Sequence, residues 1–353
     1  MKAINIGVVG ATGMVGMQFL KVLAEKNLNI GQLRLFASAR TAGRVMDFAG
    51  QSITVEELGE SSFDSAMDYA FFCASGTISK KYAPLAASKG VVVIDNSSHF
   101  RMDPTVPLVV PEVNPQAIAG HNNIIANPNC STIQAVVALG PLHQAYGIKR
   151  VVISTYQAVS GAGKEGITDL VTGLAKTSWQ TQRLLDALTD SDHEKSPIDL
   201  LRPWHQYELQ TMSDYIAGNV IPAIGDIDPA TGYTTEELKL MNETKKILGD
   251  PDLAVTATAV RVPVINGHSE SLNIELTKPY DLAELKQVLR NAKGVELLTD
   301  NPTPLKASGH DTVLVGRVRA DATRNAVDLF ISADNLRKGA ASNGVQILEL
   351  LVS

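Results

Sequence analysis

The feature that most constrains the fold is a glycine-rich turn close to the start of the chain. A β-branched run from Ile4 to Val9 leads into residues 10–16, which read GATGMVG, and residues 17–24 follow with the apolar spacing of an amphipathic helix. Glycines at three-residue intervals permit a tight turn and let a pyrophosphate approach the free N–H groups at the start of the helix. The pattern is weak evidence by itself, but between a strand and a helix it predicts a dinucleotide site.

Strand and helix patterns divide the chain into two predicted domains. Strands over 33–37, 69–74 and 91–94 alternate with helical stretches such as 80–88, which predicts a Rossmann-type, doubly wound parallel sheet. We place this domain at residues 1–129, completed by 334–353, where a helix over 335–351 is expected to return to it.

Residues 130–333 are predicted to form a second, α+β domain with a mixed sheet. Predicted helices cover 132–146 and 281–292, and the predicted strands cover 151–157, 254–264, 271–276, 313–320 and 326–332. A more polar stretch over 176–214 is expected to decorate this domain. The fold class is therefore α/β, with this second domain following the nucleotide-binding one.

Composition excludes several classes of function. The 353 residues carry 31 basic and 37 acidic side chains, a net charge of −6 that provides no positive field for nucleic acid. No apolar run approaches the ~18 residues that span a bilayer, and no signal-peptide pattern follows Met1, so we expect a cytoplasmic protein with no membrane partner. Two cysteines cannot form a disulfide framework, and no Cys/His cluster has metal-ligand spacing.

The residues after the second predicted strand favour NADP over NAD. An NAD site places Asp or Glu there to bind the ribose hydroxyls, whereas this chain has Ser38, Arg40 and Thr41. A guanidinium makes bidentate bonds to a phosphate, so Arg40 suits the 2′-phosphate of NADP. The other interpretation is that Arg40 is an ordinary solvated loop residue.

Cys130 is the candidate nucleophile. It lies in the turn 127–132, NPNCST, at the start of an apolar helix, where helix N–H dipoles are expected to favour thiolate and lower the cysteine pKa. Cys73 lies inside an apolar run and is interpreted as core. A thiolate beside a nicotinamide suggests attack on an aldehyde or activated acyl carbonyl, followed by hydride transfer at the same carbon. Of the seven histidines, His268 is the best candidate acid–base group, because it lies near Arg261, which could bind a carboxylate.

With these residues assembled, the chain resembles the aspartate-β-semialdehyde dehydrogenase family over essentially its whole length. The matching segments, in order, are GATGMVG at 10–16, SARTAG at 38–43, DNSSHFR at 95–101, VPEVN at 110–114, NPNCST at 127–132, QAVSG at 157–161, NETKKI at 242–247, RVPV at 261–264, GHSE at 267–270 and DNLRKG at 334–339.

The resemblance implies roles for individual residues. Cys130 would carry the acyl-enzyme, His268 would be the general acid–base, and Gln157 would orient the substrate near the thiol. The implied substrate-binding residues are Arg261 for the α-carboxylate, Glu243 for the α-amino group, and Arg101 with Lys246 for the phosphate. The implied contacts to NADP come from Gly10, Thr12, Gly13, Met14, Val15, Ser38, Arg40, Thr41, Ser160, Gly161 and Asn335.

The implied reaction is the NADPH-dependent reductive dephosphorylation of L-aspartyl 4-phosphate to L-aspartate 4-semialdehyde through a cysteine thioester. It would serve the biosynthesis of lysine through diaminopimelate, and of threonine, methionine and isoleucine. The partners would be these small molecules and phosphate. The family suggests a homodimer or tetramer built through residues 130–333, which would be the catalytic and dimerisation domain.

Two alternatives stay open. N-acetyl-γ-glutamyl-phosphate reductase shares the fold, thiol and cofactor, but it typically has glycine before the cysteine and an aromatic residue after it, unlike Asn129 and Ser131 here. A non-catalytic NADP-binding regulator would have kept the fold without the chemistry. Glyceraldehyde-3-phosphate dehydrogenase expects an SCTTN nucleophile segment, which is absent.

Overall fold

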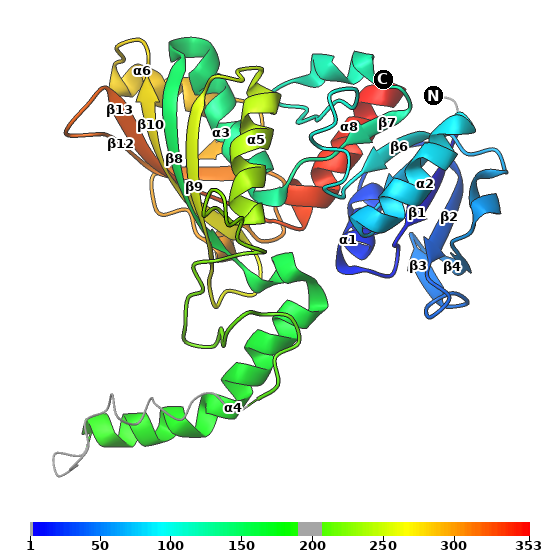
Figure 1. Ribbon diagram of the computed structural model, residues 1–353, viewed down its shortest axis with the longest axis horizontal. Coiled ribbons are helices and arrows are strands. Elements are labelled where there is room, and N and C mark those ends of the chain that lie inside the picture. Colours follow the sequence, from blue (N-terminus) through cyan, green and yellow to red (C-terminus); the bar gives the residue numbers. More distant parts are fainter. Residues whose placement is uncertain (1–2, 190–206) are drawn as a thin grey trace.

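The molecule is built on two β-sheets whose elements meet along one junction. The structure is a computed structural model that describes residues 3–189 and 207–353. In Figure 1 the N-terminal sheet and its helices lie on one side, the second sheet lies on the other, and α8 (Ser342–Val352) lies between them. No helix in these two ranges is long and apolar enough to cross a membrane.

The first sheet has seven strands in the order β3-β4-β2-β1-β5-β6-β7 and is parallel except for the β3/β4 pair. The strands are β1 (Ile4–Val9), β2 (Ile30–Ala37), β3 (Val45–Phe48), β4 (Gln51–Glu57), β5 (Tyr69–Phe72), β6 (Val92–Asp95) and β7 (Ile124–Ala126). Because the strand order changes direction at β1, the carboxyl ends of β1 and β5 form the crevice where such sheets bind ligands.

Helices cover both faces of this sheet. On one face, α1 (Met14–Ala24) and α8 share a core cluster that includes Phe19 and Leu348. On the other, α2 (Gly76–Ser88) contributes Ala83 and Ala86 to a cluster with Phe72. The doubly wound parallel sheet predicted from sequence is thereby confirmed.

The second sheet has six strands in the order β11-β12-β13-β10-β8-β9 and is mixed, with parallel pairs at β11/β12 and β8/β9. The strands are β8 (Ile148–Gln157), β9 (Ala254–Arg261), β10 (His268–Leu276), β11 (Val295–Leu297), β12 (Val313–Ala320) and β13 (Ala326–Ala333). The mixed sheet was predicted, whereas the short strands β3, β4, β7 and β11 were not.

One face of the second sheet is packed and the other is open. The helices α3 (Cys130–Tyr146), α5 (Thr235–Leu248) and α6 (Leu282–Asn291) contact its strands. Along β8 the buried Val151 and Ile153 alternate with partly exposed residues up to Tyr156, which is 41% exposed. The face that carries Tyr156, called the open face here, is thus the more exposed face along β8.

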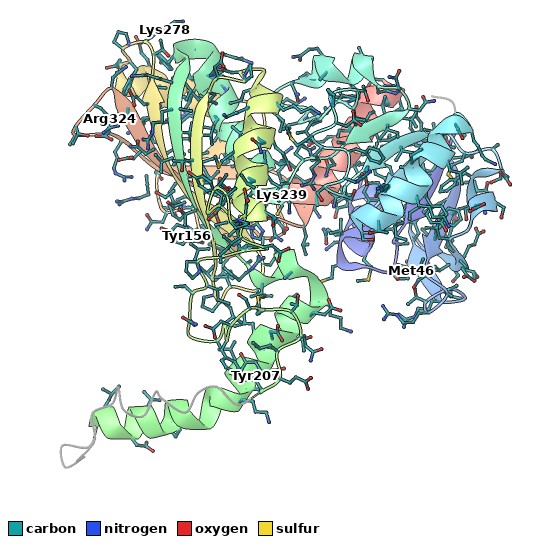
Figure 2. The ribbon with its side chains drawn as sticks, in the orientation of Figure 1. Met46, Tyr156, Tyr207, Lys239, Lys278 and Arg324 are labelled. Atoms are coloured by element: carbon teal, nitrogen blue, oxygen red, sulfur yellow. The ribbon has the colours of Figure 1, made fainter. Side chains whose placement is uncertain are left out.

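A helical arm leaves the body where a polar decoration was predicted. In Figure 1, α4 (Gly163–Thr189) extends away from both sheets. The predicted polar region over 176–214 thus holds the end of this helix and part of the returning chain, while residues 190–206 of it lie outside the described residues. The interval 207–227 runs back from the arm towards α5, and Figure 2 shows Tyr207 beside α4.

The predicted C-terminal helix is divided in two. A π-helical turn, η5 (Arg337–Ala341), precedes α8. Arg337 forms ion pairs with Glu25 at the end of α1 and with Asp311 of the second half of the molecule, at 2.6 and 2.9 Å. The turn is therefore fixed to both sides of the junction, and it is the segment of the C-terminus nearest to Cys130.

Candidate active site

Cys130 is the first residue of α3 and lines a cavity of about 320 Å³ at the junction. Asn129 caps the helix, its Oδ1 accepting hydrogen bonds from the backbone N–H groups of Ser131 and Thr132 at 3.0 and 3.3 Å. Gly339 of η5 leaves room for the cysteine, because a Cβ at that position would lie 2.9 Å from Cys130 Cβ. Nucleophile loop, helix start and C-terminal turn therefore converge on the thiol.

The expected lowering of the Cys130 pKa is wrong for the protein in this state. Burial, reinforced by the negative charge of Glu236, raises the pKa of the thiol to about 12, although Arg101 and Arg261 act in the opposite direction. The N–H groups at the start of α3 stabilise a thiolate less than the sequence suggested, because two of them already donate to Asn129 Oδ1. Burial therefore favours the neutral thiol over the thiolate.

His268 is the first residue of β10 and is fully buried. Burial, assisted by the positive charge of Arg261, lowers the pKa of the imidazole to about 3, so the ring is neutral. Its Nδ1 accepts the backbone N–H of Ala158 at 3.0 Å, and its Nε2 has no partner among the residues that the structure describes. A neutral imidazole has one N–H, so here Nε2 carries the proton and is a donor.

The imidazole lies behind the bare Cα of Gly161, which lines the cavity. A Cβ at Gly161 would lie 3.1 Å from Nε2 of His268 and 3.0 Å from Nη1 of Arg261. Arg261, the last residue of β9, lines the same cavity and donates from Nη1 to the carbonyl of Ala158 at 2.7 Å. A carboxylate in the cavity would therefore find a guanidinium held in a fixed orientation.

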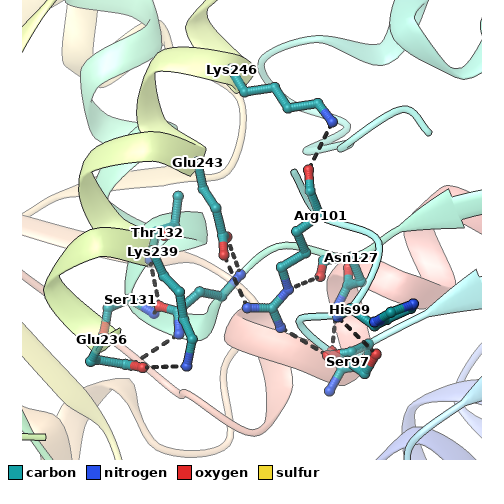
Figure 3. A network of polar contacts seen from close by, with 12 residues as sticks. Ser97, His99, Arg101, Asn127, Ser131, Thr132, Glu236, Lys239, Glu243 and Lys246 are labelled. Atoms are coloured by element: carbon teal, nitrogen blue, oxygen red, sulfur yellow. Dashed lines mark hydrogen bonds and ion pairs between the residues drawn. The ribbon is translucent and has the colours of Figure 1, made fainter. Parts of the chain in front are cut away.

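Glu236 and Lys239 are cavity residues that sequence reasoning missed. Glu236 Oε1 accepts hydrogen bonds from Gln157 Nε2 and Asn129 Nδ2, and Lys239 lies 3.1 Å from Glu236 Oε2. Burial would raise the pKa of Glu236, but Lys239 and the two amide donors outweigh it and lower the pKa to about 2. Figure 3 shows the pair together, and Figure 2 places Lys239 at the junction. The cavity thus holds a permanent carboxylate beside the thiol.

Glu243 and Lys246 do not line the cavity, contrary to the expectation that they contact substrate. Glu243 is buried, forms an ion pair with Arg101 at 3.1 Å and accepts the backbone N–H of Asn129 at 2.7 Å. Lys246 donates to the carbonyls of Arg101, Asp103 and Val106 at 2.7 to 2.9 Å. Figure 3 shows Lys246 at the opposite end of this network from Glu236. Both residues support the loop that carries Arg101.

Arg101 itself lines the cavity with its guanidinium anchored from behind. Nε donates to the carbonyl of Asn127 and Nη2 to that of Asn96, at 3.0 and 2.8 Å. Together with Lys239 it brings a second group of positive charge to the cavity, separate from Arg261. The other predicted site residues that line the cavity are Val15, Gln157, Ser160, Gly161 and Asn335. His268 does not line it, and its Nε2 lies directly behind Gly161, which does.

The predicted cofactor residues lie in the glycine turn, in the loop after β2 and at the cavity itself. Gly10 has φ +80°, and a Cβ there would lie 2.5 Å from the carbonyl oxygen of Cys73, so the turn requires glycine. Helix α1 starts after Gly13 with no side-chain cap, which leaves its N–H groups free for a pyrophosphate. Thr12 and Thr41 hydroxyls are 3.2 Å apart, which joins the glycine turn to the loop after β2.

The loop after β2 completes the fit to NADP. Ser38 and Arg40 are exposed beyond the end of that strand, with no carboxylate in the predicted position. At the cavity, Ser160 and Asn335 hydrogen-bond to each other at 3.0 Å, and both line it together with Gly161. Over the described ranges no group of three or more His, Cys, Asp or Glu could hold a metal ion.

Comparison with known families matches both halves of the chain. A model described as the semialdehyde dehydrogenase NAD-binding domain matches residues 5–121, and one described as the semialdehyde dehydrogenase dimerisation domain matches residues 139–338. The boundary at residue 129 stays a prediction, since it falls between the two matched ranges.

Individual relatives match over nearly the full length. Aspartate-semialdehyde dehydrogenase of Aquifex aeolicus is 47% identical over 99% of this chain and 98% of its own, and that of Bacillus subtilis is 45% identical over the same shares. A solved structure of aspartate-semialdehyde dehydrogenase II from Vibrio cholerae, complexed with ASA, is 44% identical with a TM-score of 0.86 over 100% and 99% of the two chains. The enzyme from Candida albicans, solved with NADP, is 25% identical with a TM-score of 0.74 over 99% of each chain.

Proposed function

The chain belongs to the aspartate-semialdehyde dehydrogenase family of NADP-dependent oxidoreductases, and we propose that Cys130 carries the family's chemistry as a thioester. Sγ attacks the acyl carbon of L-aspartyl 4-phosphate, so that the S–C bond forms while the bond from carbon to the phosphate oxygen breaks. The observation that carries the proposal is the position of the thiol, at the start of α3 and inside a cavity of charged side chains.

Two opposite charges in the cavity suit the ends of an α-amino acid. We assign the α-carboxylate to Arg261 and the α-ammonium to Glu236, whose low pKa keeps it ionised. Arg101 and Lys239 supply the remaining positive charge and are assigned to the phosphate. Glu236 and Lys239 thus replace Glu243 and Lys246 in the roles that the sequence suggested. An N-acetylated substrate has no ammonium for Glu236, which favours aspartyl phosphate over the N-acetylglutamyl alternative.

We assign the acid–base role to His268, acting first as a donor. With Nδ1 occupied by the Ala158 N–H, the proton on Nε2 can be donated in a hydrogen bond to the substrate carbonyl oxygen as it gains negative charge. The proton of the neutral thiol passes to the departing phosphate, which is a better leaving group when it is protonated. Gln157, hydrogen-bonded to Glu236, orients the substrate beside the thiol.

NADPH, when bound, supplies the hydride that reduces the thioester carbon. The residues proposed to hold it are the glycine turn with Thr12, Met14 and Val15, the loop Ser38 to Thr41, and Ser160, Gly161 and Asn335 at the cavity. Gly339 keeps the space over Cys130 open on this side. After reduction, the S–C bond breaks, the semialdehyde leaves and Cys130 regains a proton from solvent.

We further propose that the enzyme is a homodimer joined through the open face of the six-stranded sheet. The half of the chain that matches a dimerisation domain contains this sheet. On the open face the rings of Tyr156 and Phe330 contact each other at a tilt of 35°, with centroids 5.8 Å apart, and Tyr156 is 41% exposed. The need for a free Cys130 supports a cytoplasmic location, where thiols stay reduced.

The test is oxidation of aspartate semialdehyde in the presence of phosphate and NADP. We expect NADP reduction that depends on phosphate, is absent in Cys130→Ser and is blocked by iodoacetamide with the label mapped to Cys130. Arg40→Ala should lower kcat/KM for NADP about tenfold while changing that for NAD little, because only NADP carries a phosphate for the guanidinium to bind. Full activity after stoichiometric labelling of Cys130 would exclude the mechanism, and preference for N-acetylglutamate semialdehyde would favour the alternative enzyme.

A further inference from the structure

A strap, defined here as residues 207–227, crosses one face of α4 on its way from the arm to α5. Four buried residues of α4, at helical spacing, form that face: Gly166, Asp169, Leu170 and Gly173. A Cβ at Gly173 would lie 2.5 Å from the Tyr207 hydroxyl oxygen and 2.6 Å from Ala217 Cβ, and one at Gly166 would lie 2.9 Å from Met212 Cε. The two glycines therefore let the strap pack directly against this face of α4.

Asp169 fixes the strap along the helix. Its carboxylate oxygens accept the backbone N–H groups of Gln210, Thr211 and Met212 at 2.6, 3.0 and 2.9 Å. A carboxylate with no exposed surface is costly to bury unless its acceptors are filled, and here three successive donors fill them. The strap cannot slide along α4 without breaking this set.

The strap then pairs with the strand that ends in Arg261. Ile221 and Arg261 exchange two backbone hydrogen bonds, at 2.9 and 2.8 Å, in an isolated antiparallel bridge. Ile221 is buried in a small cluster with Val159, Leu170 and Ile216. The backbone of Arg261 is thus held from one side by the strap that Asp169 fixes.

Beyond Arg261 lies a second cavity, of about 620 Å³. Two residues, Ile224 and Arg261, line both this cavity and the smaller one that contains Cys130. The rest of its lining is Ala162, Thr211, Met212, Ser213, Ile221, Ala223, Gly225, Asp226 and Ile227, which is mostly apolar and comes mainly from the strap. Ile224 and Arg261 therefore form the wall between the two spaces.

We propose that the strap determines substrate length, with Ile224 as the specificity-determining side chain that closes the catalytic cavity beside Arg261. This inference rests on the proposed function, because Arg261 is the residue assigned to the α-carboxylate. A short α-amino semialdehyde ends at that wall. A longer or N-acylated semialdehyde would have to extend beyond that wall. The Ile224 side chain blocks it, although the larger cavity on the far side has room for it.

The test compares two isoleucines of the strap. Ile224→Ala removes the wall side chain, whereas Ile227→Ala makes the same change at a residue that lines only the outer cavity and is 60% exposed. We expect Ile224→Ala to raise kcat/KM for N-acetylglutamate semialdehyde, relative to aspartate semialdehyde, by about tenfold or more. The ratio in Ile227→Ala should equal that of the unsubstituted protein.

A second measurement needs no enzymatic activity. Alkylation of Cys130 by a bulky maleimide, divided by alkylation by iodoacetamide and mapped by mass spectrometry, should rise in Ile224→Ala and stay unchanged in Ile227→Ala. Asp169→Asn, which turns one acceptor oxygen into a donor facing the backbone N–H groups, should raise KM for aspartate semialdehyde more than it lowers kcat. Ile224→Val provides a graded variant if Ile224→Ala does not fold.

Equal ratios in Ile224→Ala and Ile227→Ala, in both the substrate and the alkylation measurements, would overturn the proposal. Different outcomes contradict the two proposals. If the protein has no semialdehyde activity but Ile224→Ala selectively raises bulky alkylation, the proposed function is wrong and the proposed role of Ile224 stands. If activity is normal and both ratios are unchanged, the proposed function stands and the role of Ile224 is wrong.

Discussion

Glu270 lies two residues beyond His268 on β10 and is a buried acid that the mechanism does not use. Gln134 of α3 donates from Nε2 to Glu270 Oε1 at 2.7 Å, while Glu270 Oε2 and Gln134 Oε1 have no partner within 3–189 and 207–353. Burial raises the pKa of Glu270 to about 8, only partly opposed by that hydrogen bond. A protonated acid could donate from Oε2 to Gln134 Oε1, so the neutral form suits the site and the ionised form does not.

Glu270 should make the free energy of unfolding fall as the pH rises. The folded protein binds a proton more tightly than the unfolded chain, so the stabilisation is complete below the unfolded pKa, near 4.5, and is lost as the pH rises to about 8. Glu270→Gln keeps the shape of the protonated acid and should remove this dependence. We expect it to unfold at the same temperature as the parent at pH 5, and several degrees higher at pH 8.5. Equal shifts at both pH values would contradict the assignment.

At single residues, the sequence could predict a residue's place in an element but not its electrostatic state. The turn before α3 predicted Cys130 at a helix start, where the structure has it, because that pattern is contained in a few neighbouring residues. The direction of its pKa shift depends on burial and on Glu236, which is 106 positions away along the chain and comes close only through the fold. The tautomer of His268 likewise depends on the backbone of Ala158.

Helix α5 shows why the sequence can predict which residue types contact a ligand and still assign them to the wrong turn of a helix. It carries two Glu-x-x-Lys pairs seven residues apart, Glu236 with Lys239 and Glu243 with Lys246, so both pairs lie on about the same side of the helix. Their position along the axis distinguishes them, because the first turn lies at the cavity and the later turns lie under the Arg101 loop. Sequence spacing gives the side of a helix but not which turn meets the ligand.

The two lysines of α5 should therefore fail in different ways. Lys239→Ala should raise KM for phosphate at least tenfold in the phosphorylating direction, with a small change in melting temperature, because Lys239 is partly exposed at the cavity. Lys246→Ala leaves three carbonyls without their donor and should lower the melting temperature by a few degrees. Steady-state kinetics and thermal unfolding of both variants separate the roles. The reverse pattern would restore the sequence-based assignment.

On the scale of the whole molecule, the two-sheet architecture could be predicted because each domain repeats a regular pattern of strands and helices. The arm could not, since α4 has an amphipathic pattern but extends away from both sheets (Figure 1). Its packing depends on the strap, which carries no regular secondary structure and whose partners, such as Asp169, lie about 40 residues earlier. Long-range pairing of an irregular segment leaves no local signal in sequence.

The open sheet face should control the oligomeric state. Phe330→Lys, placed beside Tyr156, puts a charge on the face proposed to meet the second copy and should convert the dimer to monomer. Leu305→Lys, at a leucine of α7 (Pro304–Ala307) that is 87% exposed, is the matched control and should leave the dimer intact. Light scattering after size exclusion measures both masses. A dimeric Phe330→Lys protein would place the interface elsewhere.

The position of α8 also bears on how the chain is made. Val345, Ile347 and Leu348 belong to the same core cluster as Val8 and Phe19, more than 300 residues earlier, and Arg337 joins that cluster's side of the molecule to Asp311. A ribosome releases these residues long after the first strand, so the nucleotide-binding half lacks part of its core until the second sheet has been made. The same segment brings Gly339 beside Cys130, so the first core and the cavity are completed by one stretch of chain.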